Sequence, residues 1–174
     1  MENLKEGRRY PYAEAYAIAL DVLEQLRPHC FRIEIAGSLR RKKAEIGDVE
    51  IVAIPKPYST DPVETGLASI VNRWPKVRGE LEYNKTKSTQ RILPSGIKLD
   101  LFLATEQNWG HILAIRTGSA DYSHKVLACG WVRRGFKSDG GILFRNGKRH
   151  EIHEEEDLFK LIGLPYVRPE DRNL

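Results

Sequence analysis

The sequence predicts an α+β fold, in which a mixed sheet with helices on one side is followed by a small C-terminal α/β unit. Three observations predict it. Alternating apolar and polar residues are typical of strands, and they occur at 31–35, 48–54 and 97–102. Apolar residues at helical spacing occur at 11–26 and 61–74. From residue 117 onward, helical patterns surround a single hairpin signal, which indicates a separate unit.

The composition fits a globular protein with a core of its own. The chain has 174 residues, 41% of them hydrophobic and 30% charged, which is long enough for one domain or two small ones. No apolar run approaches membrane-spanning length and no signal peptide is evident, so we expect a cytoplasmic protein without a membrane partner, nucleoid-associated or inside a host cell if virus-encoded. Cys30 and Cys129 are far apart and fit reduced side chains. The net charge of +4 leans toward a polyanionic partner.

The first elements lead the chain into a turn of small residues. From Pro11 to Pro28 the apolar stripe of a helix consists of Ala15, Ile18, Ala19, Val22, Leu23 and Leu26. The alternation of Phe31, Ile33 and Ile35 then predicts a strand that ends just before Gly37 and Ser38. Before the helix, Arg9 precedes Tyr10-Pro11 and either lies at the rim of a site or belongs to a solvated tail.

The stretch from Ala36 to Ile51 has the composition of a functional site. Gly37 permits a close backbone approach to a ligand, and Ser38 adds a hydroxyl donor. Four cations follow at 40–43 and suit phosphate. After Gly47, the acids Asp48 and Glu50 lie two residues apart, which places both carboxylates on one face of a strand.

A third acid completes the pattern expected of a magnesium site. Asp100 alternates with Leu99 and Leu101 in another predicted strand. Three carboxylates near phosphate-binding cations suit Mg²⁺, which prefers hard oxygen ligands and substrate phosphates. A lone Gly-Ser is usually only a turn and a run of cations is usually a solvated face. The ordered combination is what favours a site that holds two metal ions.

The remaining segments alternate between helical and strand patterns. Asp61-Pro62 predicts the start of a helix with an apolar face that ends at Trp74, a core residue. Between 77 and 98, polar residues that include Lys85, Lys87, Ser88 and Arg91 could line a substrate groove. A helix is predicted over 105–115, a second one capped by Ser119 over 120–133, and a last one over 154–162. Asn146-Gly147 predicts a two-stranded hairpin.

These motifs in this order resemble family X DNA polymerases of the polymerase beta nucleotidyltransferase superfamily. The resemblance rests on Gly37-Ser38-Leu39-Arg40-Arg41, Gly47-Asp48-Val49-Glu50, Leu99-Asp100-Leu101, Arg116-Thr117-Gly118-Ser119 and the segments 156–166 and 169–172. It implies a nucleotidyltransferase palm domain over 1–116 and a nucleotide-selecting, thumb- or fingers-like domain over 117–174. It also implies a reduced form without the N-terminal lyase domain and its helix-hairpin-helix DNA clamp.

The resemblance also implies roles for individual residues. Asp48 and Glu50 would bind two Mg²⁺ ions, which Mn²⁺ could replace, and Asp100 would complete the ion at the primer 3′-hydroxyl. The residues that match nucleotide-binding positions are Arg9, Gly37, Ser38, Arg41, Gly47, Gly118, Ser119, Tyr122 and Ser123. The cations available in the second domain to hold the DNA backbone are Lys125, Arg133, Arg134, Lys137, Arg145, Lys148 and Arg149.

Several positions depart from the family pattern. Glu50 replaces the usual second aspartate, and Ile115-Arg116 replaces the aromatic pair before Thr-Gly-Ser, so exclusion of ribonucleotides is not implied. Ser123 and Leu127 occupy the positions of the family's asparagine and arginine minor-groove contacts, which predicts low template fidelity.

Three functions remain open at this stage. The first is a monomeric DNA polymerase that adds nucleotides to primer-template or gapped DNA, with short gap filling in DNA repair as its role. The second is a template-independent or RNA-directed nucleotidyltransferase on the same fold. The third is a non-catalytic DNA-binding module whose metal site was lost at Glu50.

Overall fold

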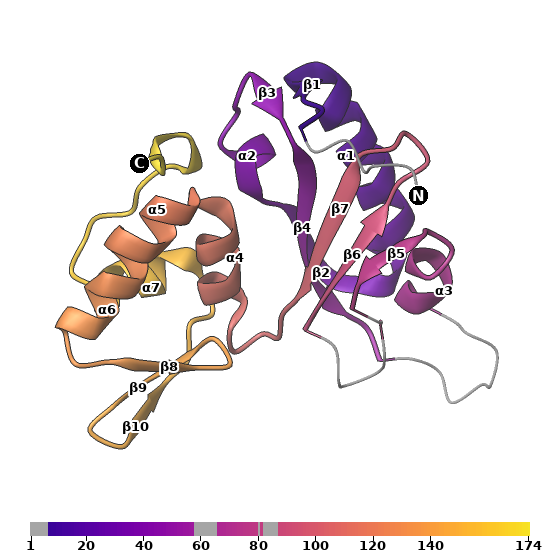
Figure 1. The fold of residues 1–174 in the computed structure, drawn as a ribbon. Coiled ribbons are helices and arrows are strands. Elements are labelled where there is room, and N and C mark those ends of the chain that lie inside the picture. Colours follow the sequence, from indigo (N-terminus) through magenta and orange to yellow (C-terminus); the bar gives the residue numbers. More distant parts are fainter. Residues whose placement is uncertain (1–6, 58–65, 80, 82–86) are drawn as a thin grey trace.

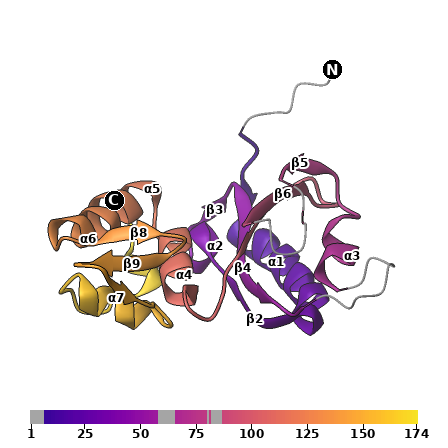
Figure 2. The same ribbon diagram turned by 90° about the horizontal axis from the view of Figure 1, so that it is seen from below.

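The chain forms two units that lie side by side (Figure 1). The structure, a computed structural model, describes residues 7–57, 66–79, 81 and 87–174. The predicted helix start at Asp61-Pro62 and the predicted groove residue Lys85 lie outside these described residues. No helix within the described ranges is long and apolar enough to span a membrane. Figure 2 shows the units from below, with helices α2 and α4 where they meet.

The N-terminal unit is built on a five-stranded mixed sheet, as the sequence predicts. Its strand order is β2-β4-β7-β6-β5. The strands are β2 Cys30–Ile35, β4 Asp48–Pro55, β5 Lys76–Arg78, β6 Ser88–Ile92 and β7 Lys98–Leu103. Only the central pair, β4 and β7, is parallel, and the other neighbours are antiparallel. A separate short pair joins β1 Tyr10–Pro11 to β3 Glu45–Ile46. The predicted α+β fold is therefore confirmed.

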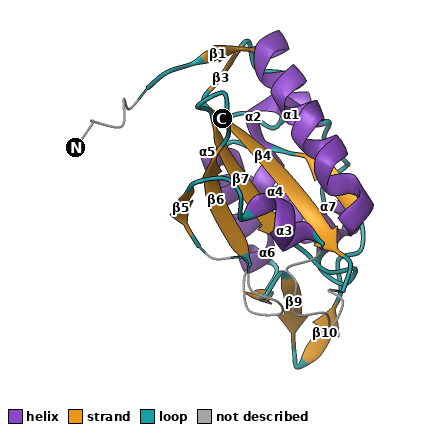
Figure 3. Cartoon of the chain, turned by 90° about the vertical axis from the view of Figure 1, so that its right-hand side faces the viewer, coloured by secondary structure: helices purple, strands orange, loops and turns teal. Residues whose placement is uncertain are grey.

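Helix α1 Tyr12–Leu26 packs along one face of this sheet (Figure 3). Its buried residues are those of the predicted stripe, with Ile18 at its partly buried margin. They share a core with the odd-numbered residues Val49, Ile51, Leu99 and Leu101 of the sheet. Trp74 and the short helix α3 Leu67–Val71 belong to the same core. The chain leaves α1 through a 3₁₀ turn, η1 Arg27–His29, that contains Pro28.

One predicted core residue of β2 lies outside the core. Phe31 is 68% exposed, whereas Ile33 and Ile35 are buried as expected. The register between β2 and β4 shifts between Cys30 and Arg32, so an extra residue interrupts the alternation. Because a bulge changes which face a side chain occupies, Cys30 enters the core in place of Phe31.

The C-terminal unit combines helices with a small antiparallel sheet. Its helices are α4 Trp109–Thr117, α5 Ala120–Tyr122, α6 Cys129–Arg133 and α7 Glu155–Leu161, with a 3₁₀ turn η3 at Pro169–Asp171. The predicted helix over 120–133 is interrupted by a π-helical stretch, η2 Ser123–Ala128. The predicted hairpin, β9 Ile142–Arg145 with β10 Lys148–His150, gains a third strand, β8 Lys137–Asp139. Positive φ at Asn146 and Gly147 fits the two-residue turn.

Helix α4 contributes to two cores. Its Ala114 joins the core of the C-terminal unit. Trp109 and Leu113 pack instead against Val52 and Ile54, on the opposite face of the sheet from α1. The domain boundary at 116/117 stays a prediction, because α4 bridges the two units.

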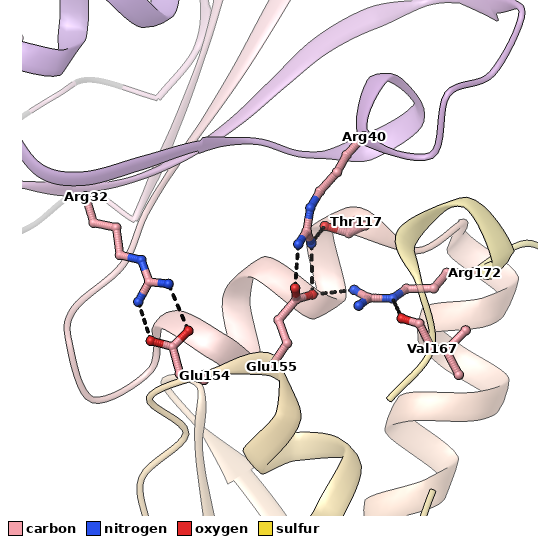
Figure 4. Close-up of polar contacts among 7 residues, drawn as sticks. All are labelled: Arg32, Arg40, Thr117, Glu154, Glu155, Val167 and Arg172. Atoms are coloured by element: carbon pink, nitrogen blue, oxygen red, sulfur yellow. Dashed lines mark hydrogen bonds and ion pairs between the residues drawn. The ribbon is translucent and has the colours of Figure 1, made fainter. Parts of the chain in front are cut away.

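Ion pairs join the units on this same side (Figure 4). From the end of α2 Gly37–Arg40, the Arg40 guanidinium donates to both carboxylate oxygens of Glu155 at 2.6 and 2.9 Å and to Thr117 Oγ1 at 2.8 Å. Arg172, which is fully buried, donates to Glu155 and to the Val167 carbonyl. Burial raises the pKa of Glu155, but hydrogen bonds and charge from both arginines outweigh it, so the pKa lies below its usual value.

A second bridge lies nearer the solvent. Arg32 of β2 donates to both oxygens of Glu154 at 2.6 and 2.8 Å, and its guanidinium lies over the Trp109 ring. The side chains of Arg32 and Glu154 are each about half exposed. Neighbouring glutamates therefore make one buried and one exposed bridge between the units.

We expect the two glutamates to differ in their effect on stability. Glu155→Gln leaves the buried Arg172 and the partly buried Arg40 without a charge partner and should lower the free energy of unfolding by about 3 kcal/mol. Glu154→Gln should lower it by less than about 1 kcal/mol, because its pair is exposed. Urea denaturation followed by tryptophan fluorescence measures both.

The difference in stability between the wild type and Glu155→Gln should also depend on pH. A carboxyl with a lowered pKa stabilises the fold above its unfolded pKa, and this contribution disappears as the pH falls through the folded value. The gap between wild type and Glu155→Gln should therefore shrink in acid. If Glu154→Gln and Glu155→Gln lost the same free energy of unfolding at neutral pH, the buried bridge would contribute no more than the exposed one, which would contradict this prediction.

Candidate active site

Three carboxylates lie on one face of the sheet. Asp48 and Glu50 are on β4, and Asp100 is on the adjacent parallel strand β7. The strand register places Glu50 directly opposite Asp100. All three residues are half-buried, whereas their neighbours Val49 and Leu99 are in the core on the other face. Because successive side chains of a strand point to opposite faces, the three acids share one face of the sheet.

The carboxylates influence one another's protonation. Burial, followed by the charge of Asp100, raises the pKa of Asp48 above its usual value. Burial and the charges of Asp48 and Asp100 raise the pKa of Glu50 to about 7, although Arg41 and Arg116 oppose this rise. Like charges held close in a half-buried site favour the binding of protons or cations.

Two neighbours fix the positions of these acids. Gln90, opposite Asp100 on β6, donates from Nε2 to Asp100 Oδ1 at 2.7 Å. The Glu50 carboxylate lies against Gly37, whose φ is +61°, and a Cβ at that position would overlap it. Glycine is thus required at 37 both for its backbone conformation and for the space that Glu50 occupies.

The chemistry of these oxygen donors suits Mg²⁺ better than a softer metal. In the structure the Glu50 carboxylate lies against Gly37. Among the described residues, no three or more His, Cys, Asp or Glu side chains are grouped closely enough to hold a metal ion.

The predicted phosphate-binding turn is the single-turn helix α2. The backbone N–H groups at the start of a helix lack partners within it, and here they belong to the turn that begins at Gly37 and Ser38. Arg41 follows it and donates from Nη1 to the Thr117 carbonyl at 2.8 Å and from Nε to Asn173 Oδ1 at 3.0 Å. Burial lowers the pKa of Arg41, and the charge of Glu50 opposes this.

Arg9 lies beside the carboxylates. The pairing of β1 with β3 brings it near Gly47, where a Cβ would be 3.2 Å from Arg9 Nη1. Its charge, with that of Lys98, opposes the raised pKa of Asp48. Arg9 is exposed to solvent beside Gly47.

The predicted nucleotide-binding residues 118–123 have structural roles in this arrangement. Ser119 Oγ accepts hydrogen bonds from the Tyr122 and Leu174 backbone N–H groups, both at 3.2 Å. Ser123 Oγ donates to the Ile115 carbonyl at 2.7 Å. Tyr122 is buried, its hydroxyl has no partner among the described residues, and Gly118 packs closely against it. Of the four predicted residues in this segment, Gly118 and Ser119 are partly exposed, whereas Tyr122 and Ser123 are buried.

The cations predicted to bind DNA are all exposed, but they do not form one cluster. Three of them line an open groove of about 480 Å³ with apolar neighbours; its lining is Lys125, Val126, Gly130, Arg133, Arg134, Ile162 and Leu164. The others, Lys137, Arg145, Lys148 and Arg149, lie on the three-stranded sheet. Arg145 stacks on Phe136, and Arg149 pairs with Glu151.

Sequence analysis missed three residues that the structure brings to the site. The hydrogen bond from Gln90 to Asp100 has no sequence signal, since it depends on strand register. Arg40 is noted as one of four cations that suit phosphate and in the Gly37-Ser38-Leu39-Arg40-Arg41 motif, but it binds Glu155 in the C-terminal unit. Arg116 is noted in the Arg116-Thr117-Gly118-Ser119 motif and as a departure at 115–116, but no role in the site is predicted for it; its Cζ lies 4.0 Å from the centroid of the Phe102 ring, near Glu50.

Comparison with known proteins agrees with this geometry. Residues 112–173 match the family described as DNA polymerase beta thumb. The DNA nucleotidylexotransferase of Bos taurus is 25% identical over 205 aligned residues, which cover 92% of this chain. The chain spans only 40% of that relative's length. Among solved structures, the chain is similar to the polymerase beta of Leishmania infantum in a ternary P/T complex, with a TM-score of 0.66 and 19% identity. That match covers 97% of this chain and 78% of the other, and it shows that the two share a fold.

The raised pKa of Glu50 gives a measurable titration. In solution without divalent ions, its ¹³C carboxyl signal should titrate near pH 7, well above an ordinary glutamate. Because the folded state then holds this proton more tightly than the unfolded state, stability should fall as the pH rises from about 5 to 8.

A matched variant separates this effect from other groups. Glu50→Gln should remove both the titration near pH 7 and that part of the pH dependence. A Glu50 midpoint close to 4.5 would show that the burial and charge described above do not act on it.

Proposed function

We propose that this chain, a family X polymerase-like protein, is a DNA polymerase that adds nucleotides from deoxynucleoside triphosphates to a primer 3′-hydroxyl. We further propose that it fills short gaps during DNA repair. The observation that supports the proposal most is the register of β4 and β7, which places Glu50 opposite Asp100 beside the α2 turn. The ternary complex of the similar polymerase beta supports DNA and nucleotide as partners.

In this mechanism each residue of the site has a distinct task. Asp48, Glu50 and Asp100 would hold two Mg²⁺ ions, which when bound activate the primer hydroxyl and stabilise the leaving oxygens. Gln90 keeps Asp100 in a fixed orientation through its hydrogen bond. The turn at Gly37 and Ser38, with Arg9 at its rim, binds the triphosphate. Positioning and electrostatic stabilisation provide most of the catalysis in such phosphoryl transfers.

The exposed cations of the C-terminal unit would hold the DNA backbone. Lys137 and Lys148 lie on the outer strands of the small sheet and make no ion pair with any described residue. Contacts of this kind are sensitive to salt and carry no sequence information. The expectations of a monomer and of a cytoplasmic location stay predictions.

A template-independent nucleotidyltransferase is the second candidate. At the two positions that resemble the family's minor-groove contacts, Leu127 is fully buried in the core of the C-terminal unit and the Ser123 hydroxyl binds the Ile115 carbonyl. Neither side chain is free to contact a template base. The similarity to the bovine DNA nucleotidylexotransferase also supports this candidate.

Single-nucleotide incorporation tests the proposal. A labelled DNA with a one-nucleotide gap and the matching single strand are incubated with each nucleotide and Mg²⁺ or Mn²⁺. We expect insertion of the complementary nucleotide in the gap, and a loss of at least a thousandfold in Asp100→Asn, because one metal ligand is removed. Asp139→Asn, an exposed acid on β8, should retain activity.

The outcomes separate the candidates. Extension of the single strand without template preference would support the second candidate. Salt-dependent DNA binding without incorporation would support a non-catalytic binding module. Undiminished incorporation by Asp100→Asn would contradict the proposed active site.

The DNA-binding prediction has its own measurement. Lys137→Gln and Lys148→Gln should each weaken binding to gapped DNA and reduce the slope of log K against log salt concentration by about 1. Fluorescence anisotropy across a salt series measures this slope. Lys56→Gln, an exposed lysine of the N-terminal unit, serves as the control and should leave the slope unchanged.

A further inference from the structure

Arg116 reaches from the C-terminal unit to the face that carries the carboxylates. It lies in the last turn of α4, and its side chain is exposed. Its Cζ is 4.0 Å from the centroid of the Phe102 ring. Phe102 follows Asp100 by two residues on β7, so both side chains are on the same face of the sheet. The aromatic ring thus provides a platform that holds the guanidinium beside the site.

Two arginines flank Glu50, and they differ in how far they are engaged. The charges of both Arg41 and Arg116 act on the Glu50 carboxylate. Arg41 is bound to Thr117 and Asn173 of the C-terminal unit. Arg116 forms no hydrogen bond or ion pair with another described residue, apart from its ring contact with Phe102. Its N–H donors therefore remain available next to the carboxylates.

The geometry of a stacked guanidinium determines which ligand it can take. The Arg116 guanidinium lies over the Phe102 ring, and a guanidinium carries its N–H donors in a planar fork that matches phosphate oxygens. Glu50 lies against Gly37, at the start of the α2 turn, so an anion bound at this turn is next to the carboxylate that Arg116 faces.

We propose that Arg116 is a further nucleotide-binding residue that contacts the phosphates of the incoming triphosphate. This inference rests on the proposed function, because it assumes that the α2 turn binds that triphosphate. Arg116 belongs to α4, whereas the turn belongs to the N-terminal unit. A bound triphosphate is therefore held from both units at once.

Binding measured without DNA tests this role separately from catalysis. Isothermal titration calorimetry with Mg²⁺ compares dATP, ATP and inorganic tripolyphosphate. Arg116→Ala should weaken all three by a similar factor of about ten or more, because each loses the same charge-assisted hydrogen bonds. Arg116→Lys keeps the charge but loses the forked donors of arginine. Its affinity for each ligand should lie between that of the wild type and that of Arg116→Ala.

The controls make each outcome decisive. Arg27→Ala removes an exposed arginine at the end of α1 and should bind all three ligands like the wild type. Because Arg116 is exposed, its variants should melt at the wild-type temperature. In the incorporation assay Arg116→Ala should raise KM for the nucleotide more than it lowers kcat.

Three results would overturn the inference. Unchanged tripolyphosphate binding with an altered ratio of ATP to dATP affinity would assign Arg116 to the sugar instead. Unchanged binding of all three, in a wild type that incorporates nucleotides, would reject Arg116 and leave the proposed function intact. A wild type that binds no triphosphate would reject both the role of Arg116 and the proposed function.

Discussion

The contact between Arg40, Glu155 and Arg172 governs how the two units meet. A buried carboxylate is costly to desolvate, and here two guanidinium groups compensate for that cost. Arg40 ends α2, the turn on which Glu50 rests, while Glu155 begins α7. The position of the α2 turn relative to the C-terminal unit is therefore held by an ion pair. It is reinforced by the apolar packing of α4 on the sheet.

This constraint changes the interpretation of the basic run at 40–43. As a sequence, four cations beside a glycine turn suggest a phosphate site. In the structure, Arg40, Arg41 and Lys42 all contact the C-terminal unit, through Glu155, Thr117 with Asn173, and Glu170 respectively. Much of the charge of this run holds the units together. Arg116 supplies donors from the other side of the same junction.

The sequence patterns predicted the features that depend on neighbouring residues in the chain. The alternation around Asp48 and Asp100 gave both strands and the shared face of the acids, and the stripe from Ala15 to Leu26 gave α1. The misses depend on distant partners or on backbone irregularities. A bulge exposes Phe31, a π-helical stretch interrupts the helix after Ser119, and only the folded chain pairs Glu155 with two arginines. The placement of Glu50 against Gly37 likewise requires the packing of α2 on β4.

The last residues of the chain matter for handling the protein in the laboratory. Asn173 accepts a hydrogen bond from Arg41, and the backbone N–H of Leu174 donates to Ser119 Oγ. This tail thus contacts both Arg41, which follows the α2 turn, and Ser119, which caps the next helix. An affinity tag or surface linker fused after Leu174 would be attached directly beside these contacts. Attachment at exposed positions of the β9–β10 turn would leave them undisturbed, because that turn belongs to the small sheet.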